Sequence, residues 1–311
     1  MDGRAWTLAA LAALLSACAL NNALETPPRP DDPDGGDGEV GEEAECGRGE
    51  LEDFQCVPAA SFLQGSPPDE AGRDDDEILH AVTITRDFHV ATTEVTQARW
   101  GELFEVPPGN PDGCPDCPVV FVSWFEALAY ANARSVLEAL PSCYVLEGCS
   151  GAFAGGCRFP QCDGSYSCAR VTFTGPECEG YRVPTEAEWE LAARGGTDAP
   201  RYGAVDDIAW IDLNSALMLH AVGEKAPNAY GAVDLLGNAQ EWTLDGYAAY
   251  PPGPLVDPVG PEGTFSRVVR GGSFVLSERY ARAAWRNVID PDTRRGDTGF
   301  RLVRSAPPLT P

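Results

Sequence analysis

Apolar residues recur at helical spacing in a few stretches of the chain, and most of these stretches open on a start signal. Residues 95–104 and 123–137 have the three-to-four-residue period of amphipathic helices. Ser123 and Thr185 are each followed three residues later by a glutamate, which is the spacing of a capping box. Gly195 is a suitable stop for the helix that follows Thr185. The pattern predicts two or three helices of modest length.

Strand signals are short and scattered. Residues 82–85 and 88–90 alternate in the manner of a strand pair, and 268–270 and 300–303 are the late strand candidates. Beyond residue 200 the chain is irregular, with Gly, Pro, Asn and Asp throughout. The sequence contains no internal repeat. Small strands, modest helices and abundant loops together predict an α+β domain.

The N-terminus carries a targeting signal. Arg4 precedes an apolar run, residues 5–15, which is too short and too rich in alanine to span a bilayer. The run ends in Leu15-Ser16-Ala17-Cys18, which resembles a bacterial lipobox, where the cysteine is lipidated and becomes the first residue of the mature chain. An ordinary secretory signal is the alternative. We expect residues 1–17 to be a lipoprotein signal peptide, with the protein exported and anchored through Cys18 to a bacterial membrane, at the periplasmic face or the cell surface.

Residues 18–45 follow the anchor and have little to bury. Nine acidic residues and one arginine lie between Ala19 and Glu45, among prolines and glycines, so ordering the segment would not be repaid by packing. We expect a disordered acidic tether. The formal net charge of −26 and the pI near 4.3 argue against a nucleic-acid partner. Residues 46–304 are enough for a folded domain, and 305–311 form a tail.

Ten cysteines remain once Cys18 is assigned to lipid, and an even number in an exported chain predicts up to five disulfides. Cys114 and Cys117 form the only C-x-x-C, which lacks the second pair that a zinc site needs and the strand-then-helix setting of a thioredoxin-type motif. Six cysteines in residues 143–178 predict a crosslinked insertion, whose pairing stays open. We expect the first two of the ten to close a small loop; the ten candidates are Cys46, Cys56, Cys114, Cys117, Cys143, Cys149, Cys157, Cys162, Cys168 and Cys178.

Separated segments in a fixed order then suggest a family. Together they cover nearly all of residues 60–304 and resemble the formylglycine-generating enzymes, the sulfatase-modifying factors. The segments are Gly65-Ser66-Pro67 with Asp76-Glu77 and His80, Glu94-Val95-Thr96, residues 118–124, residues 181–190, residues 227–242 continued by 270–274, and the closing residues 299–303. The resemblance implies that residues 46–304 are a sulfatase-modifying-factor-like domain. Its fold would be the formylglycine-generating-enzyme variant of the C-type lectin fold, which has little regular secondary structure.

The same resemblance places the family's catalytic cysteines at two positions that hold other residues here. In the family one cysteine lies two residues after the aromatic of Gly-Gly-Ser-aromatic, and a second directly follows a tyrosine. Leu276 and Ala281 occupy these positions, and neither offers the soft ligand that Cu(I) prefers. The three histidines, His80, His89 and His220, all lie more than 50 residues from Leu276, so a non-haem iron triad would have to recruit from far away. Copper is not expected.

A calcium site implied by the family matches better. The family arranges oxygen ligands around Asp/Asn-x-x-Gly-x-x-x-Glu, which here runs from Asp234 to Glu241. Asp234 and Glu241 would supply carboxylates, and Gly237 and Ala239 would supply backbone carbonyls, a mixture that suits a hard cation. A glycine turn with two solvated or capping carboxylates is the alternative. We expect a structural calcium ion here.

Arginines and aromatics surround the two altered positions. Arg270, Arg282, Arg286 and Arg301, in an otherwise acidic chain, are expected to be buried ion-pair partners rather than a clamp for a ligand. The aromatic residues of this region are expected to belong mostly to the core.

Two functions of different class remain open. The first is a non-catalytic binding module on a membrane-anchored lipoprotein, with an unidentified protein or glycan partner. The second is an oxidoreductase related to formylglycine generation, oxidising protein cysteine with another ligand set. Leu276 and Ala281 favour the first. Fold alone does not decide, because one scaffold supports many functions.

Overall fold

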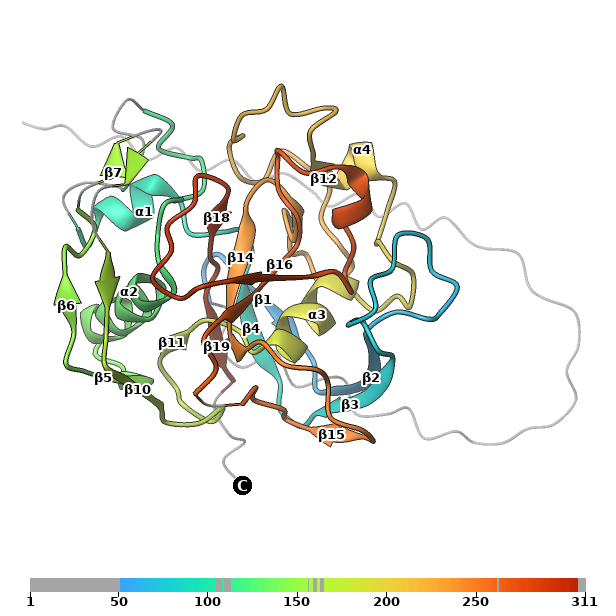
Figure 1. Cartoon of the computed structure of the whole chain (residues 1–311), viewed down its shortest axis with the longest axis horizontal. Coiled ribbons are helices and arrows are strands. Elements are labelled where there is room, and N and C mark those ends of the chain that lie inside the picture. The colour runs from blue at the N-terminus through green and yellow to red at the C-terminus, as the bar shows by residue number, and fades with distance from the viewer. Residues whose placement is uncertain are drawn as a thin grey trace, which may run out of the picture. The chain divides into compact units, whose positions relative to one another are not determined.

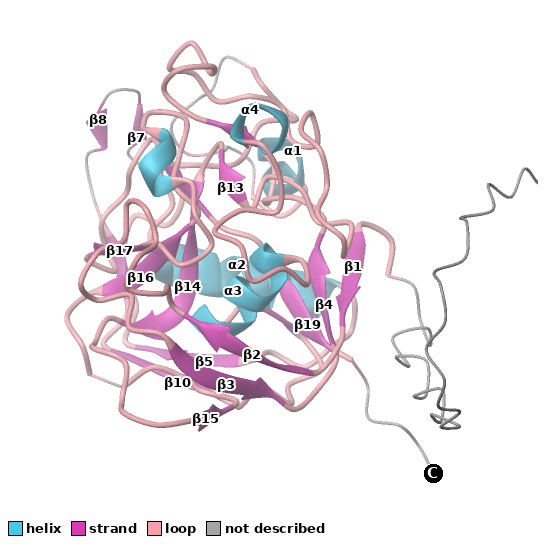
Figure 2. Ribbon diagram, turned by 90° about the vertical axis from the view of Figure 1, so that its right-hand side faces the viewer, coloured by secondary structure: helices cyan, strands magenta, loops and turns pink. Residues whose placement is uncertain are grey.

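Several small sheets, rather than one large one, organise the domain. The computed structural model describes residues 51–306, except 105–107, 109–112, 156, 159–160, 163–164 and 262. Short strands are joined by long loops, and the helices are few (Figures 1 and 2). The predicted α+β class, with little regular secondary structure, is confirmed.

A four-stranded antiparallel sheet brings the beginning and the end of the described chain together. Its order is β1-β4-β19-β11. In β19, Val303 pairs with Val90 on one side and with Arg182 on the other. The last strand is therefore internal to this sheet. The strands are β1 (Phe54–Val57), β4 (Phe88–Ala91), β19 (Val303–Ser305) and β11 (Tyr181–Arg182).

A second four-stranded sheet, of order β17-β16-β14-β18, lies at the centre of the molecule (Figure 1). All seven residues of β14 are buried, and its pairing with β16 contains an irregularity after Trp242. The strands are β17 (Arg286–Ile289), β16 (Arg267–Arg270), β14 (Gln240–Gly246) and β18 (Thr298–Gly299).

The remaining sheets are smaller. A three-stranded sheet has the order β15-β3-β2, and four two-stranded sheets pair β10 with β5, β12 with β13, β6 with β9, and β7 with β8. Their bounds are β15 (Leu255–Val256), β3 (His80–Ile84), β2 (Ala60–Gln64), β10 (Arg170–Phe173), β5 (Tyr144–Glu147), β12 (Ala209–Trp210), β13 (Leu236–Gly237), β6 (Ser150–Gly151), β9 (Tyr166–Ser167), β7 (Cys157–Arg158) and β8 (Gln161–Cys162).

Two helices begin where the sequence predicts. At the start of α2 (Trp124–Leu137), the side chains of Ser123 and of Glu126, the third helical residue, accept bonds from each other's backbone N–H groups. Thr185 and Glu188 do the same for α3 (Glu186–Arg194). Gly195, in the left-handed conformation, ends α3 as predicted. The shorter helical elements are α1 (Gln97–Gly101), α4 (Val205–Ile208) and the 3₁₀ turn η1 (Glu278–Tyr280).

Three predictions about local structure are wrong in detail. Residues 300–303 are predicted as a strand, but β19 begins only at Val303. Residues 95–104 were expected to be one helix, but α1 covers only its middle, because the Val95 N–H donates to the carbonyl of Phe300 and Thr96 is the N-cap. Residues 82–85 and 88–90 do lie in strands, but β3 and β4 belong to different sheets and are not a pair. In these cases, contacts with distant parts of the chain determine the local structure.

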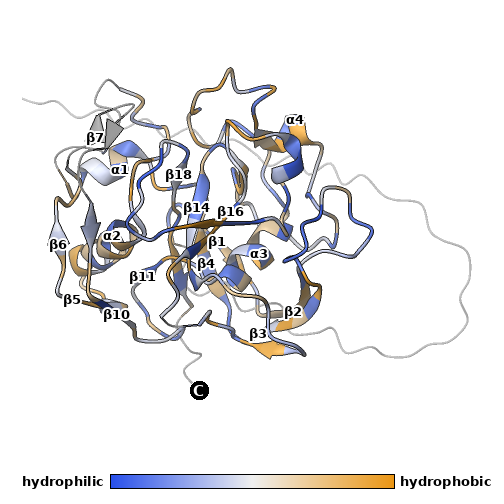
Figure 3. Ribbon diagram, viewed as in Figure 1, coloured by the Kyte–Doolittle hydropathy of each residue, from blue (hydrophilic) through white to orange (hydrophobic). Residues whose placement is uncertain are grey.

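The core consists of two main apolar clusters. Trp100, Trp124 and Trp242 belong to one, around α2 and β14, and Trp189 of α3 belongs to the other. Apolar and polar residues alternate over short distances along the ribbon (Figure 3). Many polar and charged side chains are buried together with the apolar ones. No helix within the described ranges is long and apolar enough to cross a bilayer; the apolar run 5–15 lies outside them.

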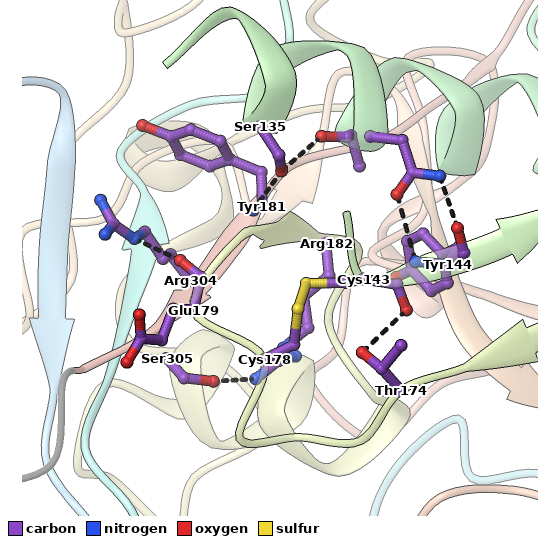
Figure 4. Close-up of a disulfide and its surroundings, with 12 residues drawn as sticks. Ser135, Cys143, Tyr144, Thr174, Cys178, Glu179, Tyr181, Arg182, Arg304 and Ser305 are labelled. Atoms are coloured by element: carbon purple, nitrogen blue, oxygen red, sulfur yellow. Dashed lines mark hydrogen bonds between the residues drawn. A yellow bond between two sulfur atoms is a disulfide. The ribbon is translucent and has the colours of Figure 1, made fainter. Parts of the chain in front are cut away.

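Three disulfides are seen in full. They join Cys143 to Cys178, Cys149 to Cys168, and Cys114 to Cys117. The first connects the residue before β5 to the approach to β11, beside the bond from the Tyr181 N–H to the Ser135 hydroxyl (Figure 4).

The other four cysteines of the folded region are described only in part. Cys56 is disulfide-bonded, while Cys46, the partner expected for it, lies outside the described residues. Cys157 and Cys162 face each other in the β7–β8 register, but their side chains are not among those described. The prediction of a crosslinked insertion is confirmed by the two bonds seen within residues 143–178.

Candidate functional site

The segment after β16 turns back on itself to form the candidate site. Gly271 and Gly272 both have positive φ, at 98° and 77°. A Cβ on Gly272 would lie 2.9 Å from the carbonyl oxygen of Tyr280, so only glycine fits this close approach without strain. The turn brings the backbone of Gly272 against the backbone of Ala281.

Leu276 and Ala281 present hydrocarbon at the two positions where the resemblance places cysteines. Leu276 is half-buried, and its carbonyl accepts a bond of 3.0 Å from the Asp212 N–H. Ala281 is buried, and its carbonyl accepts a bond of 2.7 Å from Arg201 Nε. The backbone here is held firmly, but neither side chain can ligate a metal ion or react as a nucleophile.

An irregular loop lies beside this segment and carries exposed apolar side chains. Besides the Asp212 contact, the Ser215 hydroxyl donates a bond of 2.7 Å to the carbonyl of Phe274. The loop follows β12, which lies at the top of the view near α4 (Figure 1). Its exposed apolar residues, with the neighbouring Val275, are Leu213 at 81%, Leu217 at 60%, Met218 at 60% and Val275 at 40% exposed. We call these four side chains the apolar rim.

Aromatic and cationic groups stack behind the apolar rim. The rings of Trp210 and His220 are parallel, with centroids 3.6 Å apart. Lys225, which is the only lysine in the chain, places Nζ 3.8 Å from the centroid of Trp210. Such contacts fix the loop through dispersion and cation–π attraction. His220 is therefore part of a structural stack, and sequence reasoning did not find this role.

The two other histidines lie in the strands β3 and β4 and have no hydrogen bond to Leu276 among those of the described residues. His80 begins β3, and its ring Nδ1 lies 2.9 Å from the carbonyl oxygen of Ile78. His89 lies in β4 and is buried, and burial lowers the pKa of its imidazole. The three histidines occupy separate elements, which gives no support to an iron triad.

The four arginines expected in ion pairs are all buried, and each binds a buried carboxylate. Two of the carboxylates, Glu186 and Glu190, lie on helix α3, and a third, Glu77, lies just before β3. Arg270 of β16 and Arg286 of β17 therefore connect the central sheet to α3. The pairs, with N–O distances of 2.6 Å each, are Arg270 with Glu190, Arg282 with Glu77, Arg286 with Glu186, and Arg301 with Glu241. Arginines so engaged are not available to clamp a ligand.

The expected calcium ligands lie together but differ in their bonding. Asp234 is buried, and only its Oδ2 has a partner, the Gly223 N–H at 2.6 Å, while Oδ1 has none. Glu241 is fully engaged, because Arg301 binds both of its oxygens and Trp189 Nε1 donates to Oε2 at 2.8 Å. Of the expected carboxylates, Asp234 alone keeps a free oxygen.

Glu94 is a further carboxylate at this place that sequence reasoning missed. It is buried, its Oε1 lies 3.5 Å from the Ala239 nitrogen, and its Oε2 has no partner. Burial, and then the charge of Asp234, raises the pKa of Glu94 well above its ordinary value, and burial also raises the pKa of Asp234. The Glu94-Val95-Thr96 segment signalled the family but not this role.

Asp234 Oδ1 and Glu94 Oε2, which have no hydrogen-bond partner, are ligands of the type that a hard cation prefers, whereas both carboxylate oxygens of Glu241 are already bound. No three His, Cys, Asp or Glu side chains in the described part of the chain are grouped to hold a metal by themselves. A calcium ion would therefore depend on backbone carbonyls, such as those proposed for Gly237 and Ala239.

Two cavities lie at places other than the segment that carries Leu276 and Ala281. One, of about 380 Å³, is lined by Arg99, Arg134, Tyr181 and Glu94 among others. The other, of about 230 Å³, lies between Asp245, Tyr250 and Arg286. Neither includes Leu276 or Ala281 in its lining.

Comparisons with known proteins agree on the fold and family. The chain is 29% identical to the "Chaperone protein LppX" of Paenibacillus barcinonensis, over 72% of this chain and 82% of that protein. It is 37% identical to the formylglycine-generating enzyme of Thermomonospora curvata, over 67% of this chain and 65% of the enzyme. It is also 27% identical to the hercynine oxygenase of Mycolicibacterium smegmatis, over 79% of this chain and 60% of the enzyme.

Solved structures extend the likeness. Treponema denticola variable protein 1 superposes with a TM-score of 0.68 at 28% identity, over 81% of this chain and 95% of that one. PvdO from Pseudomonas aeruginosa, at 24% identity and a TM-score of 0.65, shares the fold. Residues 42–306 match the model of the sulfatase-modifying factor enzyme 1-like domain. The chain therefore belongs to the family of sulfatase-modifying factor enzyme 1-like proteins.

Proposed function

We propose that this protein is a membrane-anchored, extracytoplasmic lipoprotein whose sulfatase-modifying-factor-like domain binds a protein or glycan and does not perform the copper chemistry of the family. The observation that carries the proposal is the pair Leu276 and Ala281, because hydrocarbon replaces both residues that the family would use for copper. Six cysteines of the described region are held in disulfides, and Cys56 is bonded too. These sulfurs are therefore not free to replace the missing pair.

The apolar rim supports a binding role. Four large apolar side chains exposed around one loop are not explained by packing within the chain, and exposed apolar patches are typical of interaction sites. The relative named as a chaperone agrees with binding. The variable protein of Treponema denticola shows that the scaffold also occurs in a protein that is not named as an enzyme.

Calcium belongs to the same proposal as a structural ion. Asp234 would be one carboxylate ligand, and Gly237 and Ala239 would give backbone carbonyls. Glu94 would take the place expected for Glu241, because Glu241 is already bound to Arg301. The ion would stiffen a loop that has few regular hydrogen bonds of its own.

The first experiment asks whether family chemistry survives. The purified ectodomain, with copper and oxygen, should not convert the cysteine of a Cys-x-Pro-x-Arg peptide to an aldehyde. The double variant Leu276→Cys/Ala281→Cys should gain copper affinity, since two thiolates then lie on the same turn. Aldehyde formation by the unchanged protein, detected by peptide mass, would contradict the proposal.

A second experiment tests the binding surface. A photo-crosslinking residue at Met218, in the apolar rim, should capture a defined partner in membranes. The same residue at Val256, which is 66% exposed on β15, is the matched control and should not. Equal capture at both positions would mean that the apolar rim has no special role.

The second candidate function is an oxidoreductase. Two catalytic relatives favour it, the formylglycine-generating enzyme and the hercynine oxygenase. Stoichiometric copper or iron in the purified protein would support this candidate, and calcium alone would support the binding module.

A further inference from the structure

The disulfide between Cys114 and Cys117 differs from the other two in its place and size. It closes a loop with a sequence separation of 3, against 19 for Cys149–Cys168 and 35 for Cys143–Cys178. Its backbone remains fixed by other bonds: the carbonyls of Cys117 and Pro115 accept the N–H groups of Gln97 and Ala98, at 2.9 and 2.8 Å. The loop is therefore held in place without relying on the sulfur bond alone.

A disulfide that accepts electrons from a substrate has to leave the fold intact when it becomes a dithiol. The stabilisation from a disulfide grows with the length of the loop that it closes, so opening the shortest loop weakens the fold least. Opening Cys143–Cys178 removes a link inside the main core, where both residues are buried. Cys149–Cys168 is more exposed but holds the longer loop between β5 and β10.

The two sulfur-bearing residues at 114 and 117 are unequally accessible. Cys114 is half-buried, whereas Cys117 is 2% exposed. Pro115 and Asp116, between them, are exposed, so a polypeptide can approach from this side. Cys114 is the more accessible residue of the two, and this asymmetry points to Cys114 Sγ as the attacked sulfur and to Cys117 Sγ as the leaving sulfur.

We propose that Cys114–Cys117 is a redox-active disulfide that oxidises thiols of exported, unfolded polypeptides. In the first step a substrate thiolate attacks Cys114 Sγ, the bond between the cysteine sulfurs breaks, and Cys117 leaves as a thiolate and takes a proton from water. In the second step another thiolate of the same substrate attacks the substrate sulfur of the mixed disulfide, and Cys114 leaves as a thiolate and takes a proton from water. The substrate loses two electrons and gains a disulfide, and the cysteine pair gains two electrons as a dithiol.

The position of the pair agrees with a polypeptide substrate. The Asp116 carbonyl accepts a bond of 2.9 Å from the Val222 N–H, and Cys117 Sγ lies 3.8 Å from the carbonyl oxygen of Leu219. The pair therefore touches the loop that carries Leu217 and Met218 of the apolar rim. An unfolded chain, which exposes both apolar side chains and thiols, matches this combination. The inference needs no residue of the family's catalytic positions.

A redox titration of the intact ectodomain in glutathione buffers tests the inference. Free thiols are alkylated at each ratio and located by peptide mass. Cys114–Cys117 should open at a midpoint at least about 30 mV above that of Cys143–Cys178, a tenfold difference in equilibrium constant, while the circular dichroism of the fold is unchanged. Opening of both disulfides together, or loss of the fold when Cys114–Cys117 opens, would overturn the inference.

Two variants and a protein substrate test the roles of the sulfurs. Cys117→Ser, which leaves Cys114 free, should form a mixed disulfide with oxidised glutathione at least about ten times faster than Cys114→Ser, because Cys117 is buried. With reduced, denatured ribonuclease A as substrate, the unchanged ectodomain should oxidise one pair of substrate thiols for each Cys114–Cys117 pair reduced. Equal rates for the two variants, or no loss of ribonuclease thiols, would contradict the assignment.

Discussion

Arg301 and Glu241 form a two-pronged ion pair at the centre of the domain, with Nε 2.7 Å from Oε2 and Nη2 2.6 Å from Oε1. Neither side chain is exposed to solvent. The remaining donors of Arg301 reach the carbonyls of Ala91 and Val233. One arginine thus connects β4, β14 and the loop before Asp234, and it also takes away a carboxylate that the family pattern assigns to calcium.

Breaking this pair should destabilise the fold strongly. Arg301→Met leaves a buried, unpaired carboxylate at Glu241, and removal of one partner of a buried pair costs about 3–5 kcal/mol. Chemical denaturation measures the loss. Arg170→Ala, in an exposed pair with Glu147 at 3.9 Å, is the control and should change the free energy of unfolding by less than about 0.5 kcal/mol. Equal effects in the two variants would show that burial does not govern the pair.

Calcium should raise the unfolding temperature if Asp234 and Glu94 hold it. A ligand at one hundred times its Kd adds about 2.7 kcal/mol to stability. Asp234→Asn and Glu94→Gln should each reduce the calcium-dependent shift, and low pH should reduce it too, because protons compete for carboxyls whose pKa is raised. Asp212→Asn, which also has a carboxylate oxygen without a partner but lies outside the site, should keep the full shift.

Asp245 should make stability depend on pH. Burial, and then the charge of Glu186, raises its pKa to about 7, above about 3.9 in the unfolded chain. Because the folded state binds this proton more tightly than the unfolded chain does, the protonated carboxyl of Asp245 contributes its full stabilisation at low pH. This contribution is lost as the pH rises from about 4 to about 7. Relative to Asp245→Asn, the wild-type free energy of unfolding should fall by about 1–4 kcal/mol between pH 4 and pH 8. A constant difference across this range would be the contrary result.

Cys18→Ala should release the protein from the membrane. The lipobox interpretation makes acylated Cys18 the anchor, and no helix in the described ranges could span a bilayer instead. Membrane fractionation with detergent phase partition measures the effect, and Cys56→Ala serves as a control that should leave partition unchanged. Retention of Cys18→Ala in membranes free of other proteins would refute the lipoprotein interpretation.

Local signals in the sequence predict the helices well. Ser123 and Thr185 satisfy backbone donors within one turn, so a few adjacent residues determine where α2 and α3 begin. The buried arginines were also predictable, because isolated charges in a glycine-rich, loop-rich region need partners. The pairing of the strands was not predictable. β3 and β4 are only a few residues apart but belong to different sheets, and each has one partner from a distant part of the chain, β15 for β3 and β19 for β4.

The calcium site shows the limit of a motif. The pattern from Asp234 to Glu241 locates a cluster of carboxylates correctly, but which oxygen stays free depends on Arg301 and Gly223, which lie outside the motif. Glu94 enters the cluster from a distant part of the chain, since it lies 145 residues before Ala239, which it contacts. Spacing within one segment carries no information about such neighbours.

The internal position of β19 has a consequence for how the chain is made. Because β4 and β11 both pair with β19, the first four-stranded sheet stays divided until Val303 has left the ribosome. All residues up to β19 must be synthesised before this sheet can close. Until then the nascent protein lacks its final topology, and a truncation that ends before Val303 would leave two strand edges open to pairing with other chains.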